Sequence, residues 1–393
     1  MKASFFCTNS YLSPEPYMHR GWPTPPRWSK SDVTVQSAEY AFEQAQTADE
    51  LGFDWVACSE HHYLPALQTP NPCIFAAALS RVVKHARIAV LGPLVSMTNP
   101  VRTAEELAML DQLSGGRVIA LFLRGTPNEF LAYGVNPEET RARTQEASRL
   151  IVRALTEPEP FGWEGRYFRF RTISVWPRPI QQPHPPLFYS GNSLESATFA
   201  AENHFGLGVS FYPPHLVAQL TKHYRLECAK HGWQPQPDQV VYRAFVGVAE
   251  TDKEADSMKS RFFSIGTGAT SMFQGRASIL EAPKLDALPS ATPKEVGTDA
   301  DGKNVGADKG QAGFGFGGLQ FCGSPDRVVR QIAEFHELTG VGVLDVTFGG
   351  PGLSPDEAQR SFHLFGREVL PRIRGIGPAQ ATSASAASTT AAK

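Results

Sequence analysis

Short apolar runs alternate with longer amphipathic segments from the first residues of the chain onward. Runs with the pattern of buried strands lie at residues 3–8, 53–59, 87–95, 117–123, 186–190, 206–211, 240–248 and 342–348. Segments with helical periodicity lie at residues 33–51, 73–83, 101–113, 140–155, 193–203, 214–231, 252–263 and 355–369. Because strands and helices alternate, we expect a parallel sheet. Eight such units predict an α/β fold, a (β/α)8 TIM barrel, with functional groups where the strands end.

Three insertions interrupt this pattern, and those that follow a strand should lie over the C-terminal face of the barrel. Residues 9–32, rich in proline and aromatic residues, predict either a surface loop or the wall of an apolar site. Residues 157–182 predict a small hairpin beside the barrel. Residues 264–318 are too long for an ordinary connection and predict a lid. Residues 375–393 lack aromatic residues and predict a disordered tail, which leaves residues 1–374 as a single domain.

Charge and composition limit the classes of partner. The formal net charge of −2, with acids and bases intermixed, provides no field for binding nucleic acid or a membrane surface. The chain has no apolar run long enough to span a membrane, and the apolar positions at its start are too few for a signal peptide. Its five cysteines are scattered without C-x-x-C spacing, which disfavours a disulfide framework and a zinc site. We therefore expect a cytoplasmic protein that acts on small molecules.

The segment Ser59-Glu60-His61-His62-Tyr63 directly follows the second predicted strand. Successive side chains of an extended chain point to opposite faces, so only one of the two histidines should face a central cavity. The pair is therefore a poor metal site, and we expect no metal. An imidazole beside a carboxylate such as Glu60 is a natural proton carrier, whereas two structural histidines are the alternative interpretation.

Two other strand ends have residues suited to an anion. An arginine ends the fourth strand, and a glycine, an asparagine and two serines lie where the fifth strand turns into a helix. These residues are Arg124, Gly125, Gly191, Asn192, Ser193 and Ser196. A helix N-terminus, hydroxyl groups and a guanidinium suit a phosphate group. Ordinary N-capping by Ser193, with Arg124 on the surface, is the alternative.

Aromatic residues near the strand ends indicate the character of the substrate. Tyr11 lies in the first insertion, Tyr63 follows the histidine pair, and Phe122 lies near the end of the fourth strand. Such rings favour an apolar or aromatic substrate. The tripeptide Leu91-Gly92-Pro93 at the end of the third strand fits either the close approach of a flat ligand or a simple strand end.

Several motifs occur together in a fixed order: SEHHYLP, TNPVRTAEELAMLDQLSGGRVIALFLRG, FYSGNSLESATFAAENHFGLGVS and GSPDRVVRQI. In this order they resemble the bacterial luciferase-like flavin-dependent monooxygenase family (alkanal monooxygenase-like), most strongly over residues 53–210 and again over residues 323–350. The resemblance implies a barrel whose mouth holds FMN, supplied in reduced form by a separate flavin reductase. With O2, such two-component enzymes oxygenate small organic substrates. The family commonly forms homodimers or homotetramers.

The resemblance also assigns roles to individual positions. His61 matches the family's catalytic histidine, and Glu60 matches its acidic neighbour. Leu91 and Gly92 match a non-prolyl peptide, often cis, beneath the flavin ring. Arg124 matches the family's phosphate-binding arginine. The family's second phosphate loop is matched by Asn192, Ser193 and Ser196.

At two positions this chain differs from the luciferases, which limits the functional roles that the resemblance implies. Luciferases have a glutamate where this chain has Asn192, and a cysteine beside the flavin where this chain has Leu123. Bioluminescence is therefore not implied, although the amide of Asn192 retains the capacity to donate hydrogen bonds. The alternatives are a deazaflavin-dependent oxidoreductase, a non-catalytic flavin-binding protein and a metal-dependent hydrolase. Oxygen dependence, cofactor retention and metal content distinguish them.

Overall fold

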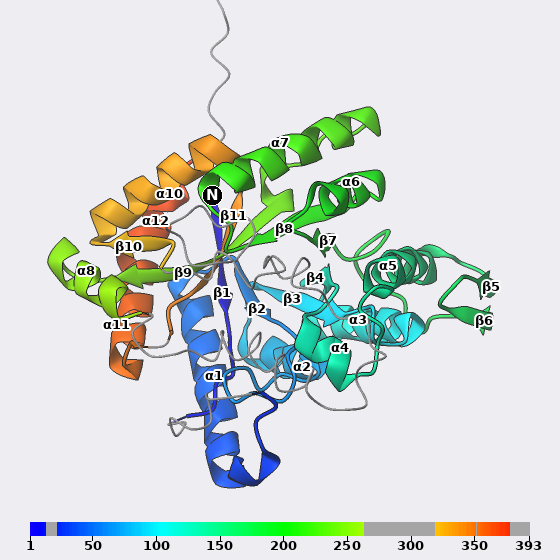
Figure 1. The fold of residues 1–393 in the computed structure, drawn as a ribbon, viewed down its shortest axis with the longest axis horizontal. Helices are drawn as coiled ribbons and strands as arrows, with labels where there is room; N and C mark the ends of the chain where they lie inside the picture. Colours follow the sequence, from blue (N-terminus) through cyan, green and yellow to red (C-terminus); the bar gives the residue numbers. More distant parts are fainter. Residues whose placement is uncertain (13–21, 263–318, 351, 378–393) are drawn as a thin grey trace, which may run out of the picture.

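Parallel strands close into a barrel, and helices surround it (Figure 1). This computed structural model describes residues 1–12, 22–262, 319–350 and 352–377. The barrel strands, in order, are β1 (Lys2–Phe6), β2 (Trp55–Cys58), β3 (Arg87–Leu94), β4 (Val118–Leu123), β7 (Leu187–Ser190), β8 (Gly206–Ser210), β9 (Val240–Val248) and β11 (Val343–Thr347). Parallel pairing of β11 with both β9 and β1 closes the ring. All eight predicted strands are present, and the predicted (β/α)8 barrel is confirmed.

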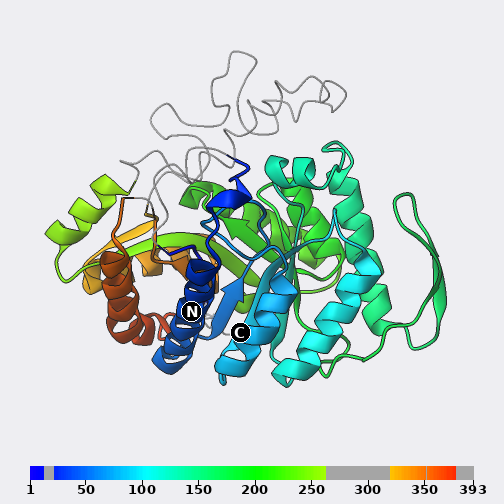
Figure 2. The same cartoon turned by 90° about the horizontal axis from the view of Figure 1, so that it is seen from below.

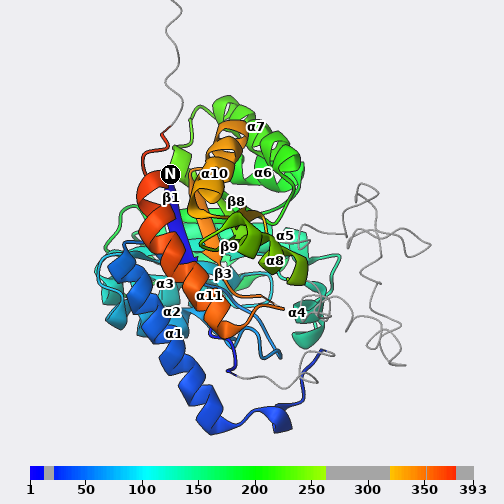
Figure 3. The same cartoon turned by 90° about the vertical axis from the view of Figure 1, so that its left-hand side faces the viewer.

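The helices cover the outside of the barrel. They are α1 (Ser31–Leu51), α2 (Pro72–Val82), α3 (Pro100–Ser114), α4 (Pro127–Ala132), α5 (Thr140–Thr156), α6 (Leu194–Glu202), α7 (Pro214–Lys230), α8 (Asp252–Arg261), α10 (Pro325–Thr339), α11 (Pro355–Leu364) and α12 (Leu370–Ile373). A π-helical turn (Phe365–Val369) joins the last two. Figure 3 shows α11 beside α1, where the end of the barrel meets its beginning. Helices α2 and α3 begin one residue earlier than predicted, because a proline follows each capping asparagine.

Strand alternation divides the core into two layers. One set of side chains fills the barrel, namely Phe6, Trp55, Ala57, Ala89, Leu91, Ile119, Leu121, Phe188, Val241 and Val343. The alternate set packs against the helices, where the buried ring of Phe122 contacts that of Phe205 edge to face. Because the side-chain period of a strand is two, the parity of each position decides whether its side chain can reach a ligand in the barrel mouth.

The remaining predicted segments have different outcomes. An antiparallel hairpin, β5 (Phe161–Glu164) and β6 (Arg169–Ile173), projects from the barrel as expected (Figure 2). The short strand β10 (Phe321–Gly323), which was not predicted, extends the pairing of β9. The predicted lid at residues 264–318 lies outside the described residues, as does the predicted tail from residue 378 onward. Residues 375–377, which the sequence predicts as the start of the tail, are within the described residues. There the carbonyl group of Ile376 accepts a hydrogen bond from the N-terminal ammonium group.

Within the described ranges, no helix is long and apolar enough to cross a membrane. Even α1, the longest of the described helices at 21 residues, is amphipathic and has buried residues along one side.

Helix α8 is tied to α11 by an ion pair whose effect should depend on pH. Nη2 of Arg261 lies 2.6 Å from Oε1 of Glu357, and Oε2 of Glu357 accepts a hydrogen bond from the backbone N–H of Ser354. Hydrogen bonds from Arg261 and Ser354 lower the pKa of Glu357 from 4.5 to about 2. A carboxylate with a lowered pKa stabilises the fold above its unfolded-state pKa, and this contribution disappears as the pH falls through the folded-state value.

We therefore expect Glu357→Gln to lower the free energy of unfolding at neutral pH. The difference from the unsubstituted protein should shrink as the pH falls from 4.5 towards 2. Urea unfolding followed by circular dichroism at several pH values measures this difference. A difference that stays constant down to pH 3 would contradict the assignment.

Candidate active site

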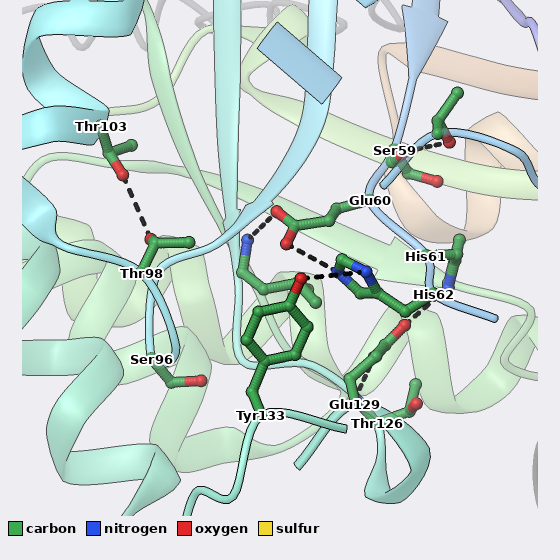
Figure 4. Close-up of polar contacts among 12 residues, drawn as sticks. Ser59, Glu60, His61, His62, Ser96, Thr98, Thr103, Thr126, Glu129 and Tyr133 are labelled. Atoms are coloured by element: carbon green, nitrogen blue, oxygen red, sulfur yellow. Dashed lines mark hydrogen bonds and ion pairs between the residues drawn. The ribbon is translucent and has the colours of Figure 1, made fainter. Parts of the chain in front are cut away.

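The two adjacent histidines follow β2 and have different surroundings (Figure 4). Nδ1 of His61 lies 2.8 Å from Oε1 of Glu129, and the His61 side chain is 14% exposed. Nε2 of His62 lies 3.0 Å from Oε1 of Glu60, and the His62 side chain is only 2% exposed. As expected from chain alternation, the neighbouring rings point in different directions and only His61 is accessible at the barrel mouth.

Glu60 is not the partner of His61, contrary to our expectation. Glu60 is buried, contacts His62, and accepts a hydrogen bond of 2.9 Å from the backbone N–H of Leu94 in β3. Residues two apart in an extended chain point to the same side, so Glu60 reaches His62 and not the intervening His61. Glu60 therefore contacts His62 and the backbone of β3, and its predicted catalytic role stays a prediction.

Glu129 was not identified from the sequence, although it is the acid that contacts His61. It lies in α4, and its Oε2 accepts a hydrogen bond of 2.6 Å from the backbone N–H of Thr126. Burial opposes ionisation of Glu129, but hydrogen bonds from His61 and Thr126, together with the charge of His61, lower its pKa overall. The carboxylate therefore fixes the orientation of His61 and favours a proton on its Nδ1.

Tyr133 lies one helical turn after Glu129, and its hydroxyl group is 3.2 Å from Nδ1 of His62. The rings of Tyr133 and His62 are 4.6 Å apart. The T-x-x-E capping pattern from Thr126 to Glu129 was the available signal for α4. That signal predicts a helix start but not the two histidine contacts.

The end of β3 lies next to these histidines. The peptide bond between Leu91 and Gly92 is cis, as the resemblance implies. A Cβ atom at Gly92 would overlap the carbonyl oxygen of Leu121 in β4, so the close approach of the two strands requires glycine here. The side chain of Leu91 faces the barrel interior together with Leu121.

The N-terminus of α6 has the expected serines. The hydroxyl oxygen of Ser193 accepts a hydrogen bond of 3.2 Å from the backbone N–H of Ser196, and the Ser193 hydroxyl donates to that of Ser196 at 3.0 Å. A Cβ atom at Gly191 would overlap the Ser196 side chain, so only glycine permits this packing. The side chain of Asn192 instead joins β7 to β8, because it both donates to and accepts from the backbone of Ser210. Asn192 thus shapes the loop.

Two arginines lie near this helix start. Arg124 directly follows β4, which pairs with β7, and its guanidinium lies 6.0 Å from the centre of the Phe130 ring. Burial raises the pKa of Tyr189 in β7 to about 12, and the positive charges of Arg141 and Arg124 oppose this rise. Arg141, which the sequence did not reveal as a candidate, also pairs with Glu195 in the first turn of α6. Gly125 follows Arg124 with a φ of 97° and turns the chain towards α4.

The three predicted substrate residues have different positions. Tyr63 is half-exposed, and its ring lies 5.8 Å from that of Trp22. Tyr11 is buried, and its hydroxyl accepts a hydrogen bond of 3.1 Å from the backbone N–H of Lys30. Phe122 packs against the helical layer and does not face the barrel mouth, so its assignment to the substrate site is wrong. Its neighbours Leu121 and Leu123 contact the interior cluster.

The donor groups at α6 fit the phosphate group of FMN. Two guanidinium groups, the hydroxyl groups of two serines and the free N–H groups of the first helical turn are all hydrogen-bond donors, as an anion requires. The negative charge of Glu195 in this turn is offset by Arg141. Donor groups that suit an anion, a glycine at a strand end and an imidazole therefore all follow the C-terminal ends of barrel strands.

Comparison with known proteins identifies relatives of this chain. An uncharacterised protein, y4wF, of Sinorhizobium fredii is 34% identical over 200 residues, which cover 50% of this chain and 58% of that protein. The chain thus covers less than two thirds of that relative. The oxygenase component of the flavin-dependent trigonelline monooxygenase of Acinetobacter baylyi is 26% identical over 69% of this chain and 78% of its own length.

Solved structures share the fold. Monooxygenase RslO1 of Streptomyces bottropensis has a TM-score of 0.69 and 24% identity, with 94% of this chain and 99% of that chain covered. The oxygenating constituent of 3,6-diketocamphane monooxygenase of Pseudomonas putida, solved in complex with FMN, has a TM-score of 0.67 and 21% identity, with 94% and 98% covered. The family model described as luciferase-like monooxygenase matches residues 18–341. The chain therefore belongs to the luciferase-like monooxygenase family.

Proposed function

We propose that this protein is the oxygenase component of a two-component, reduced-flavin-dependent monooxygenase that oxygenates a small organic, aromatic substrate. The observation that carries this proposal is the arrangement at the C-terminal ends of the strands, where the His61–Glu129 pair and the donor groups around α6 lie on one face of the barrel. The trigonelline and diketocamphane enzymes, which are flavin-dependent or contain FMN, support a flavin as the cofactor.

The residues around α6 would hold the FMN phosphate. Arg124 and Arg141 supply positive charge, Ser196 supplies a hydroxyl donor, and the first turn of α6 supplies backbone N–H groups. Leu91 and Gly92 would support the flavin ring from the end of β3. Reduced FMN, when bound, supplies the electrons with which O2 is activated for oxygenation.

His61 would control a proton at this site. Glu129 holds Nδ1 of His61, so Nε2 is the ring nitrogen left to accept or donate a proton at the barrel mouth. Tyr63, half-exposed beside this loop, would contact an aromatic substrate. Glu60 would hold the loop that carries His61 and His62 against β3, because it contacts His62 and accepts a hydrogen bond from the backbone of Leu94.

The same proposal includes partners. A separate flavin reductase would supply reduced FMN, and O2 and the organic substrate would enter at the mouth. We also propose a cytoplasmic location and a homodimer or homotetramer, in line with the composition and the family.

The contribution of Arg124 to phosphate binding is directly testable. Arg124→Gln should weaken FMN binding by about 10- to 100-fold, since a hydrogen bond to a charged group contributes about 1.5–3 kcal/mol. Riboflavin, which lacks the phosphate, should bind both proteins with similar, lower affinity. Anaerobic titration of the reduced flavins, followed by fluorescence, measures both affinities.

Arg171→Gln is the matched control, because Arg171 is exposed in the projecting hairpin. This variant should bind FMN like the unsubstituted protein. Equal loss of FMN and riboflavin affinity in Arg124→Gln would show a structural defect and contradict the phosphate assignment.

A further inference from the structure

A second chain of polar groups lies behind the His61–Glu129 pair. It runs from Glu60 through His62 to Tyr133 (Figure 4). Oε1 of Glu60 is 3.0 Å from Nε2 of His62, and Nδ1 of His62 is 3.2 Å from the hydroxyl oxygen of Tyr133. Glu60 and His62 are buried, whereas Tyr133 is 46% exposed. A carboxylate, an imidazole and a phenol therefore connect the protein interior to the surface.

The direction of these hydrogen bonds follows from the groups present. Oε2 of Glu60 already accepts the backbone N–H of Leu94, and Oε1, as an acceptor, pairs with a hydrogen on Nε2 of His62. In the neutral imidazole, Nδ1 is then the acceptor, so the hydroxyl group of Tyr133 donates to it. This leaves the lone pairs of the Tyr133 oxygen as acceptors for another donor.

The hydrogen bonds around Tyr133 provide a path for a proton towards His62. Burial raises the pKa of Tyr133, and the nearby carboxylates of Glu60 and Glu129 raise it further, so its phenol stays protonated at neutral pH. Oε1 of Glu60 lies 3.0 Å from Nε2 of His62 and so can pair with the ring after it accepts a proton, while His61 is already paired with Glu129. A phenolate on Tyr133 is disfavoured here, so a proton that leaves its hydroxyl group must be replaced by another.

We infer that Tyr133 is a catalytic residue that deprotonates the hydroxyl group of a phenolic substrate, with His62 and Glu60 as its positioning residues. The inference rests on the proposed monooxygenase function and specifies its substrate class. The Tyr133 hydroxyl passes its proton to Nδ1 of His62 as the substrate O–H passes its proton to the Tyr133 oxygen. The products are a substrate phenolate, a neutral Tyr133 and an imidazolium paired with Glu60, so protons and charge balance.

The surrounding aromatic rings match a substrate of this class. The ring of Tyr63 lies 6.0 Å from that of His62, on the same loop, and is half-exposed like Tyr133. Two exposed tyrosine rings beside one buried imidazole provide apolar contact area and a hydrogen-bond acceptor together. A phenolate is also richer in electrons than the neutral phenol, which favours attack on an electrophilic oxygen.

The test uses 4-nitrophenol as the probe, because its phenolate absorbs visible light and its neutral form does not. It is titrated into the full-length protein without flavin, at a pH where most of the free probe is neutral. The unsubstituted protein should bind the probe as phenolate, and Tyr133→Phe should bind it as the neutral phenol. Tyr40→Phe is the matched control, since the Tyr40 hydroxyl bonds Gln359 on the outer helices, and it should behave like the unsubstituted protein.

Two further readouts separate proton transfer from a structural role. The ¹⁵N shift of Nδ1 in His62 should change in Tyr133→Phe, and turnover should fall by about 10²- to 10⁴-fold while reduced-FMN affinity stays the same. In the unsubstituted protein, 4-nitroanisole should bind more weakly than 4-nitrophenol. Equal phenolate signals in the unsubstituted and Tyr133→Phe proteins, equal binding of the two probes, or no binding of 4-nitrophenol would overturn the inference. Failure to bind reduced FMN would overturn only the proposed function.

Discussion

Replacing His61 by alanine should lower the rate of substrate oxygenation by about 10²- to 10⁴-fold, the usual contribution of a general acid or base. Reduced FMN should still bind, because the phosphate site around α6 does not include His61. The ratio of H2O2 released to O2 consumed should rise, since oxygen activation continues without productive transfer to the substrate. Steady-state oxygen uptake with reduced FMN, together with product analysis, measures these quantities.

Glu129→Gln tests how much the orientation of the His61 ring contributes to activity while His61 itself is kept. It keeps the side-chain size but removes the negative charge, so the activity should lie between those of the unsubstituted protein and His61→Ala. His231→Ala is the matched control, because His231 is exposed at the C-terminal end of α7. Unchanged turnover in His61→Ala would show that His61 has no catalytic role.

Replacing Asp345 by alanine should lower the free energy of unfolding by about 3–5 kcal/mol, since it leaves a charged guanidinium without its partner inside the barrel. Asp345 is buried and accepts hydrogen bonds from the Ser4 hydroxyl at 2.8 Å and from Nε of Arg243 at 2.7 Å. The guanidinium of Arg243 also lies 3.5 Å from the centre of the Phe6 ring. Urea unfolding measures the loss.

Asp238→Ala provides the control for Asp345→Ala. Asp238 pairs with Lys2 at 2.7 Å, but both side chains are more than 40% exposed, so this pair should contribute at most about 1 kcal/mol. A double substitution, Asp345→Leu with Arg243→Met, should recover much of the stability, because both charges are removed together. A loss for Asp345→Ala no larger than that for Asp238→Ala would contradict the buried-pair interpretation.

The barrel itself was predictable from the sequence because each buried strand is an apolar run bounded by turn residues. The strand at Trp55–Cys58 is buried at every position, and so is the strand at Val343–Thr347. Patterns of this kind depend on local chain properties alone. The expected hairpin at residues 157–182 and the helix boundaries near asparagine and proline depend on equally local signals.

The candidate site was only partly predictable because it depends on contacts between distant segments. His61 could be recognised at a strand end, but its partner Glu129 is 68 residues away in the sequence. Glu60, the nearer acid, points to the other side of the chain. The sequence of β4 does not show which of its residues face inward, and a shift of one residue moves a side chain such as that of Phe122 from the barrel interior to the helical layer.

Arg141 and Tyr133 show the same limit. Arg141 lies within a long helical segment whose sequence gives no sign that its N-terminal part approaches α6. Tyr133 follows a short helix that the alternating pattern does not include, and only the barrel closure brings it to His62. Sequence patterns specify the elements, whereas the packing of β2, β4 and β7 in one sheet specifies the site.

The most direct test of the proposed function is an anaerobic titration of the purified protein with reduced FMN, followed by rapid mixing with oxygen and recording of the flavin absorbance. We predict saturable binding of reduced FMN and a return to oxidised flavin that is slower than for free reduced FMN and sensitive to Arg124→Gln. Absence of binding, or bound flavin that reoxidises just as free flavin does, would contradict the assignment as a reduced-flavin-dependent monooxygenase.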